Sequence, residues 1–295
     1  RSPARAVAAA PDGSMVSAVR TKTGAVTHPS LRAGATGHPA ARPPATRPPG
    51  LPVTACPPVL ASPSMSPHSP DAFPEHAQTV AEIAANLAAV RARVDAAATR
   101  AGRDSAEVRL LPVTKTVDEA RLRAAYEAGV TQMGENKVQE ALGKATSMAD
   151  LAIHWALIGH LQTNKAKDVA AFAHEFQALD SLRVAEALDR RLQAAGRGLD
   201  VYVQVNSSGE DTKFGLAPEQ VPAFLKALPA YASLRVRGLM TLAAHTEDRE
   251  RVVGCFRLMR ELRDAALQAG TVGEGELSMG MSGDFELAVE HGTTC

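Results

Sequence analysis

The sequence predicts an α/β protein: a (β/α)8 barrel of the TIM type that lacks its eighth strand and the helix after it. From Thr79 onward, short apolar runs alternate with longer runs of helical periodicity, and the chain contains seven such units. Parallel strands joined by crossover helices produce this alternation, because such strands are buried on both faces. Seven successive units favour a barrel over the alternative architecture, an open doubly wound sheet.

The first 74 residues differ in composition from the rest. Fifteen of the 19 prolines lie in this stretch, and Phe73 is its one aromatic residue. A stretch so poor in large apolar side chains cannot offset the entropy lost when a chain becomes ordered. We therefore expect a disordered Pro/Ala/Arg-rich tail over residues 1–74 and one barrel domain over residues 75–295.

The start of the chain has two interpretations. The chain begins at Arg1, and a methionine occurs at Met65. The tail is either upstream sequence from an over-extended reading frame or a transit peptide, since it is rich in Arg and Ser and poor in acidic residues. It has no clear amphipathic helix, which favours the first interpretation.

Charge and cysteine content argue against several classes of protein. The formal net charge is zero, which gives no reason to expect nucleic acid or an anionic membrane as a partner. The chain has no apolar run long enough for a transmembrane helix and no secretory signal at its start. Cys56, Cys255 and Cys295 are odd in number and lack metal-type spacing. We expect a cytoplasmic protein without a metal.

The first unit contains a helix and a strand. The helix is expected from Thr79 to Ala101, because Thr79 is a capping residue, apolar residues follow at helical spacing, and Gly102 comes after its end. The apolar run Val108–Val113 is the first expected strand, and it leads directly to Lys115.

Each later unit is a short apolar run followed by a helical pattern. The strands are expected at Thr131–Gly134, His154–Ile158, Phe176–Leu179, Val201–Val205, Val236–Met240 and Leu277–Met281. The helices are expected at Val117–Ala128, Asn136–Met148, Asn164–Phe172, Ser181–Ala195, Pro218–Leu228, Asp248–Ala269 and Asp284–Glu290. The chain reaches Cys295 where an eighth strand would be expected to begin.

In such a barrel, functional groups gather at the carboxyl ends of the strands. Polar residues stand there after each strand: Lys115, Glu135, Asn136, Gly159–Gln162, Asp180, Asn206, Thr241 and Ser282. Partial burial of Lys115 would lower the pKa of its amine and suit it to form an imine with a carbonyl compound. The other interpretation is a lysine that extends from the strand end into solvent.

The segment Ser278–Asp284 is a second signal. A Gly and Ser turn joins a strand to a helix there, and free backbone N–H groups beside a hydroxyl form a phosphate site. The same residues also occur as ordinary turn chemistry.

Seven blocks of the chain, in order, resemble the YggS/PROSC family of pyridoxal phosphate (PLP) homeostasis proteins. The blocks are Val113–Thr116, Gly134–Glu140, His154–Lys165, Val203–Asn206, Lys213–Gly215, Arg237–Met240 and Leu277–Ser282. The resemblance covers about residues 78–295. It implies a barrel of PLP fold-type III, similar to the amino-terminal domain of alanine racemase.

The resemblance also implies the site. Lys115 matches the lysine that holds pyridoxal 5′-phosphate as a Schiff base, and Asn136 matches an asparagine at the cofactor site. Ser282 is similar to the serine that binds the phosphate, with Gly280 and Met281 shaping its turn. Lys213 is either a secondary cofactor-handling lysine or a solvated loop lysine.

The function implied is PLP homeostasis: a monomeric, non-catalytic carrier that holds PLP and releases it to apo-enzymes. The alternative is a fold-type III PLP-dependent racemase or decarboxylase, which adds a carboxyl-terminal domain and, in racemases, a catalytic tyrosine. A third interpretation is a scaffold for interactions that binds no cofactor.

The sequence departs from the family pattern after Gly292-Thr293. A strand carrying Val-Arg-x-Gly-Ser/Thr, expected to face the pyridine nitrogen and to complete the phosphate cradle, does not follow. The chain is therefore either an incomplete sequence of an intact protein or a fragment, and for the chain as written we expect weaker retention of PLP.

Overall fold

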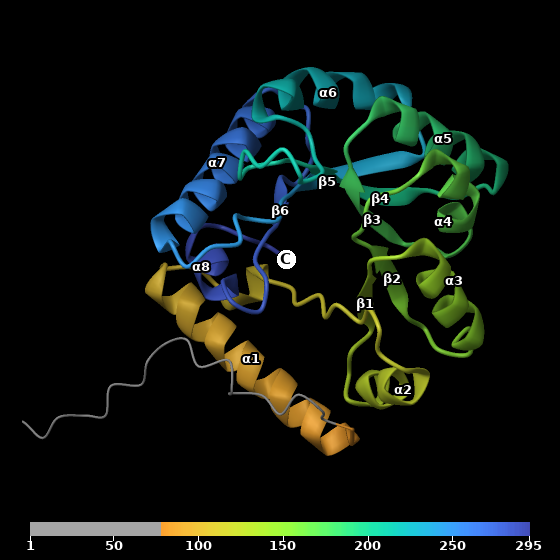
Figure 1. The fold of residues 1–295 in the computed structure, drawn as a ribbon, viewed down its shortest axis with the longest axis vertical. Coiled ribbons are helices and arrows are strands. Elements are labelled where there is room, and N and C mark those ends of the chain that lie inside the picture. Colours follow the sequence, from red (N-terminus) through yellow and green to blue (C-terminus); the bar gives the residue numbers. More distant parts are fainter. Residues whose placement is uncertain (1–77) are drawn as a thin grey trace, which may run out of the picture. The chain divides into compact units, whose positions relative to one another are not determined.

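The computed structural model describes residues 78–295. Six parallel strands form one sheet, in which every strand pairs with the next strand along the chain. The strands follow an arc, helices α2 to α7 lie outside it, and the carboxyl terminus lies inside it (Figure 1). This consecutive order is that of a (β/α) barrel, because the strand order of a doubly wound sheet reverses at its centre. The predicted fold class is confirmed.

The elements have the following bounds. The strands are Gln132–Glu135 (β1), His154–Leu157 (β2), Glu175–Leu179 (β3), Leu199–Gln204 (β4), Leu234–Met240 (β5) and Glu276–Ser278 (β6). The α-helices are Val80–Arg100 (α1), Glu119–Glu127 (α2), Val138–Ser147 (α3), Ala166–Phe172 (α4), Leu182–Ala194 (α5), Val221–Ala227 (α6), Arg249–Gln268 (α7) and Phe285–Glu290 (α8). Short 3-10 helices are Ser105–Glu107 (η2), Thr163–Lys165 (η3), Pro218–Gln220 (η4) and Leu228–Ala230 (η5).

The prediction of a first strand at Val108–Val113 is wrong. The segment makes a single parallel bridge, from Val113 to Gly134 of β1. The N–H of Thr114 donates to the Gly134 carbonyl at 2.8 Å, and the Gly134 N–H donates to the Pro112 carbonyl at 2.8 Å. Pro112 has no N–H to extend the ladder and restricts the residue before it. The described sheet therefore has six strands where the sequence predicted seven.

A seam separates β6 from the Val108–Val113 segment. Thr294 lies in this seam: its N–H donates to the Leu277 carbonyl at 2.8 Å, and its carbonyl accepts the Arg109 N–H at 3.0 Å. Through these two bonds, the single residue Thr294 links β6 to the Val108–Val113 segment across the seam.

The predicted starts of α1, α5 and α7 agree with the structure because their capping side chains make the expected bonds. Thr79 and Glu82 form a capping box at α1, in which each side chain accepts the other's N–H at 3.2 and 3.0 Å. The hydroxyl of Ser181 accepts the Val184 N–H at the start of α5, and the carboxylate of Asp248 caps α7.

Apolar side chains fill the layer between sheet and helices, whereas polar side chains occupy the inside of the barrel. Phe176, Leu239 and Trp155 are buried among helix side chains, as is Cys255 of α7. Trp155 and Cys255 both belong to this apolar core.

The polar interior is identified by its bonds. The Ser278 hydroxyl of β6 donates to the Gln177 amide oxygen of β3 at 2.8 Å. Because β3 and β6 are not neighbours in the sheet, this bond crosses its concave side. In most TIM barrels, bulky branched apolar side chains fill the barrel interior, so the polar pair Ser278 and Gln177 departs from that pattern.

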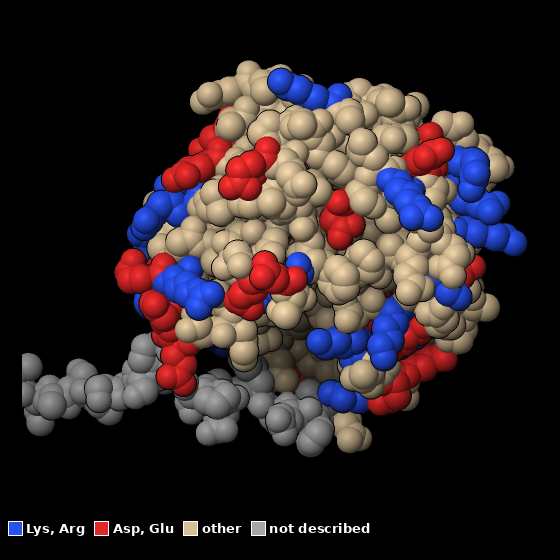
Figure 2. Space-filling model, turned by 45° about the horizontal axis from the view of Figure 1, so that its top comes forward, with Lys and Arg blue, Asp and Glu red and all other residues tan. Residues whose placement is uncertain are grey.

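The helices of residues 78–295 include none that is both long and apolar enough to cross a membrane. On the face shown in Figure 2, acidic and basic side chains are interspersed, and neither sign forms a broad area.

Candidate functional site

The predicted site residues lie at the carboxyl edge of the sheet. Lys115 follows the bridge residue Val113, Asn136 follows β1, and Ser282 follows β6. The strands are parallel, so these segments share one edge of the barrel. Lys115 and Asn136 extend from paired segments, while Ser282 comes from the other side of the seam.

Lys115 sits in a tight turn. The Val117 N–H donates to the Thr114 carbonyl at 3.1 Å, which leaves Lys115 and Thr116 as the central residues. Thr116 has φ 63°, and it is the one non-glycine residue with positive φ in the described part of the chain. A β-branched residue in this region costs about 1–3 kcal/mol. The side chain of Lys115 is exposed and has no hydrogen bond or ion pair with residues 78–295.

The residues on both sides of Lys115 contact one charged cluster. Lys144 Nζ of α3 donates to the Thr114 carbonyl at 2.8 Å and to Glu135 Oε1 and Glu140 Oε1 at 2.7 Å each. Glu140 Oε1 also accepts the Thr116 N–H at 2.6 Å. The hydrogen bond from Lys144, followed by that from Thr116, holds the pKa of Glu140 below its usual value.

Glu135 is the buried member of this cluster. Its side chain is 0 % exposed, and its Oε1 accepts the Thr114 hydroxyl at 2.6 Å. Its Oε2 has no hydrogen-bond partner among the described residues. A buried carboxylate with a single cationic partner depends strongly on that partner.

Asn136 is exposed and is packed against Gly159, which follows β2. A Cβ at Gly159 would lie 2.0 Å from the Asn136 carbonyl oxygen and 2.6 Å from its Oδ1. Only glycine permits this approach.

The turn Gly280–Ser282 offers hydrogen-bond donors. Gly280 has φ 101°, and a Cβ there would lie 2.7 Å from the Ala288 Cβ. The Met281 N–H donates to the carboxylate of Asp284, whose pKa is raised by burial. The N–H groups of Ser282 and Gly283 and the Ser282 hydroxyl have no partner within residues 78–295. Such a group of free donors fits a phosphate.

Lys213 has partners. Its Nζ donates to the Ala243 carbonyl at 2.8 Å and lies 3.3 Å from Glu210 Oε1, and its side chain is 22 % exposed. The next residue, Phe214, stacks on His160 at a centroid distance of 4.1 Å. The loops after β2 and β4 therefore meet above the carboxyl edge.

A network of ionisable groups lies at the opposite, amino end of the strands. Arg109 donates to Glu175 Oε2 at 2.7 Å and to the Tyr202 hydroxyl at 3.0 Å, and Tyr202 donates to Glu276. Burial, with the nearby charge of Glu175, raises the pKa of Tyr202 above its usual value. Sequence reasoning did not single out this network.

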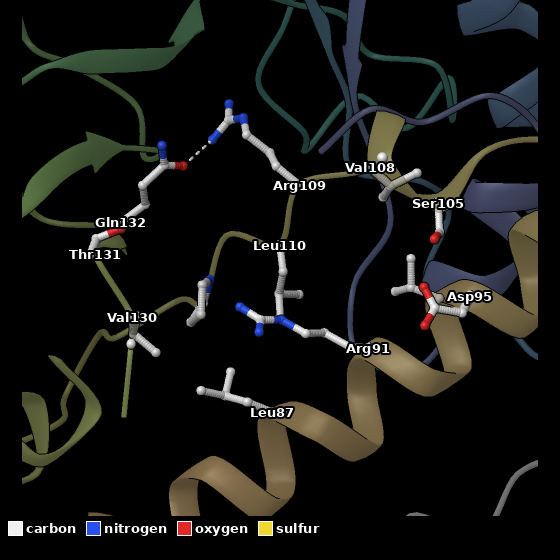
Figure 3. A pocket seen from close by; sticks show the side chains of 14 residues that line it. Leu87, Arg91, Asp95, Ser105, Val108, Arg109, Leu110, Val130, Thr131 and Gln132 are labelled. Carbon is white, nitrogen blue, oxygen red and sulfur yellow. Dashed lines mark hydrogen bonds between the residues drawn. The ribbon is translucent and has the colours of Figure 1, made fainter. Parts of the chain in front are cut away.

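A cavity of about 460 Å³ lies between α1 and the segments before and within β1. Figure 3 shows Leu87, Arg91 and Asp95 of α1 on one side and Val130 and Gln132 on the other. None of the predicted site residues lines this cavity, so it is separate from the site at the carboxyl edge.

His, Cys, Asp and Glu side chains form no metal-binding group of three or more in the described part of the chain. Of the charged cluster, the sequence carried one signal: Glu140 and Lys144 are four residues apart on a predicted helix, a spacing that favours an ion pair. No pattern in the sequence predicts the contacts of this pair with Thr114, Thr116 and Glu135.

Comparison with known proteins adds to this geometry. The family model for the alanine racemase N-terminal domain matches residues 85–295. The pyridoxal phosphate homeostasis protein of Pseudomonas aeruginosa is 42% identical over 212 residues, which cover 72% of this chain and 90% of that protein. The protein of the same name from Aquifex aeolicus is 38% identical, with 70% and 91% covered.

Solved structures show the same similarity. An unknown protein from Bifidobacterium adolescentis has a TM-score of 0.68 at 36% identity, covering 73% of this chain and 92% of that one. PipY of Synechococcus elongatus, with PLP bound, has a TM-score of 0.62 at 32% identity, covering 72% and 94%. Alanine racemase from Streptomyces coelicolor, at 20% identity and a TM-score of 0.53 with 70% and 61% covered, shares the fold.

Proposed function

Because this chain belongs to the pyridoxal phosphate homeostasis proteins and carries an alanine racemase N-terminal domain, we propose that it holds PLP as a Schiff base on Lys115 and releases it to apo-enzymes. The protein acts as a monomeric, non-catalytic carrier in this proposal, and residues 75–295 form its PLP-binding domain. A relative of similar fold with PLP bound supports the choice of ligand.

The observation that carries the proposal is the free amine of Lys115 on a strained turn at the carboxyl edge. Lys115 would supply the amine that condenses with the aldehyde of PLP to a carbon–nitrogen double bond, with loss of one water. The reaction reverses when water returns, so the same amine both holds and releases the cargo.

Two further groups fit PLP. The free N–H groups of Ser282 and Gly283 and the Ser282 hydroxyl fit a phosphate, and Gly280 and Met281 shape this turn. Asn136, held against Gly159, supplies an amide beside the lysine turn. We propose that these residues bind and orient PLP. The amine of Lys213 donates to the Ala243 carbonyl in the loop after β5, so in this proposal Lys213 has only a secondary part in handling PLP.

A carrier fits this edge better than a racemase does. Racemisation needs positioned acid and base groups on the substrate. A tyrosine is one such group in racemases of this fold, but no tyrosine of the described residues lies at the carboxyl edge. Tyr202 is bonded inside the amino-end network, Tyr126 lies in helix α2, and Tyr231 lies in the loop before β5. Lys115, Asn136 and Ser282 are exposed, which suits exchange of a ligand with other proteins. The similarity to alanine racemase supports the fold alone.

The test uses the full chain mixed with PLP, its absorbance recorded before and after borohydride reduction, and the modified peptide located by mass spectrometry. We expect an imine band that reduction fixes on Lys115. Lys115→Arg keeps the charge but cannot form the imine, so it should lose the band, whereas Lys167→Arg on the exposed face of α4 should keep it. Modification at another lysine would contradict the assignment.

Release is tested separately. The loaded protein is added to a PLP-dependent apo-enzyme in the presence of a scavenger for free PLP. Recovery of enzyme activity above that given by the same amount of free PLP supports a carrier. Interconversion of L- and D-alanine by the loaded protein would instead support the enzyme.

A further inference from the structure

We infer that Lys144 is a positioning residue for Lys115: with Glu135 and Glu140 it forms a brace that holds the turn Thr114–Thr116 in the conformation that presents the Lys115 amine. This inference rests on the proposed function, since it concerns the orientation of the proposed Schiff-base lysine. The brace is the set Glu135, Glu140 and Lys144.

The ammonium of Lys144 is fully used. It has three donors, and they go to the Thr114 carbonyl, Glu135 Oε1 and Glu140 Oε1 at 2.7–2.8 Å. Its side chain is 12 % exposed, and that of Glu135 is 0 % exposed. A solvent-facing lysine at helical spacing from a glutamate would not have this third bond to a loop carbonyl. Lys144 therefore ties α3 and β1 to the turn.

The brace contacts the residues on both sides of Lys115 and leaves Lys115 itself free. On one side, Glu135 accepts the Thr114 hydroxyl and Lys144 donates to the Thr114 carbonyl. On the other, Glu140 accepts the Thr116 N–H at 2.6 Å. With both flanking residues fixed, the direction in which the Lys115 side chain leaves the backbone is fixed as well.

The strain at Thr116 explains why the turn needs a brace. A threonine with φ 63° is in a conformation that its β-branched side chain disfavours. Such a conformation persists only where surrounding contacts over-determine it. The Thr116 N–H points at Glu140 in this conformation, so removal of that acceptor allows the peptide to relax and re-aims Lys115.

A conservative variant separates positioning from charge. Glu140→Gln keeps an oxygen that can accept the Thr116 N–H, whereas Glu140→Ala removes it. If the brace positions the turn, Glu140→Ala weakens PLP binding by about tenfold or more, as misorientation of a reacting group does, while Glu140→Gln stays within about threefold of the wild type. Equal losses in the two variants would overturn the inference.

The role of Lys144 is tested in a variant in which the charge of its buried partner, Glu135, is also removed. Lys144→Met alone leaves Glu135 as an unpaired buried charge and can prevent folding. The double variant Lys144→Met with Glu135→Gln removes both charges. We expect this protein to melt cooperatively and still be modified on Lys115 by borohydride reduction, but to bind PLP about tenfold more weakly or worse. Wild-type affinity in the folded double variant would overturn the role of Lys144.

A measurement without PLP distinguishes failure of the brace from failure of the proposed function. Hydrogen–deuterium exchange of the Thr116 N–H should be faster in Glu140→Ala than in the wild type and unchanged in Glu140→Gln and Lys167→Met. Unchanged exchange in Glu140→Ala would overturn the inference whether or not PLP binds. Faster exchange with no imine on wild-type Lys115 would retain the brace and reject the proposed function.

Discussion

At the scale of single residues, the strained turn at Lys115 and Thr116 distinguishes the carboxyl edge of the barrel from its amino end. Thr116 is the one described non-glycine residue in the left-handed region, and it adjoins the proposed Schiff-base lysine. Its conformation is held by Glu140 and, through Thr114, by Lys144. Strained backbone conformations cluster at functional sites, so the strain at Thr116 supports a functional role for the free amine of Lys115 beside it.

Replacing Thr116 by glycine should stabilise the fold while weakening the site. Glycine removes about 1–3 kcal/mol of strain but adds about 1 kcal/mol of unfolded-state entropy, so we expect a net gain of about 1 kcal/mol in the free energy of unfolding. Urea unfolding at equilibrium measures it. PLP affinity should fall, because glycine no longer restricts the turn; a stabilised protein with unchanged affinity would contradict this.

Glu140 should make stability depend on pH in the acid range. The hydrogen bond from Lys144, then that from Thr116, lowers its folded-state pKa below the ordinary value of 4.5. A carboxyl with a lowered folded-state pKa adds stability above its unfolded pKa, and that stability is lost as the pH falls through the folded value. The stability difference between wild type and Glu140→Gln should therefore be present at neutral pH and shrink in acid. Urea unfolding across this range tests it, and a constant difference would contradict the assignment.

At the scale of elements, close approaches of backbone decide where the strand ends lie. The loop after β2 passes so near Asn136 that position 159 accepts only glycine. The segment Val108–Val113 shows the opposite case: its apolar pattern predicts a strand, but Pro112 lacks a donor and only one bridge forms. Hydrogen bonding to neighbours, more than the pattern of one segment, determines whether it becomes a strand.

Two glycine-to-alanine variants should act in opposite directions. Gly159→Ala places a Cβ 2.0 Å from the Asn136 carbonyl oxygen and should cost about 1–3 kcal/mol. Gly143→Ala in α3 meets nothing within 4 Å and should stabilise the helix by about 0.5–1 kcal/mol. Thermal melting of both variants tests this, and a Gly159→Ala protein as stable as the wild type would show that the approach can relax.

At the scale of the whole barrel, two polar regions have different tasks. At the amino end, Arg109, Glu175, Tyr202 and Glu276 join strands that are not neighbours in the sheet. At the carboxyl end, the lysine turn, Asn136 and the Gly280–Ser282 turn are open. We expect the bonded amino end to fix the distances between strands and so to keep the exposed groups of the carboxyl end in place.

Loss of the amino-end network should destabilise the barrel. Arg109→Met leaves Glu175 and Tyr202 without their shared donor, and we expect a cost of about 2–4 kcal/mol. Arg235→Met removes an ion pair with Asp200 whose arginine side chain is 58 % exposed, and it should cost less than about 1 kcal/mol. Urea unfolding of both variants makes the comparison; similar costs would show that the interior network contributes no more than a surface pair.

The sequence alone was sufficient for the alternation of strands and helices, the capped starts of α1, α5 and α7, and the family to which the chain belongs. These depend on local chemistry and on ordered motifs: a Thr or Ser hydroxyl at a helix start, periodic apolar residues, and blocks such as Gly134–Glu140. The same local reading placed Asn136 and Ser282 after strands and Lys115 after an apolar run. The structure has all three at one edge, although that run makes only a single bridge.

Only the tertiary structure decided what surrounds those residues. The bonds from Lys144 to Thr114 and Glu135, the positive φ of Thr116 and the Arg109 network join groups far apart along the chain. The loss of the expected first strand also depends on which segments lie beside it. Such contacts follow from packing in three dimensions, since a charge or a peptide group finds its partner by distance in space and not by spacing in the sequence.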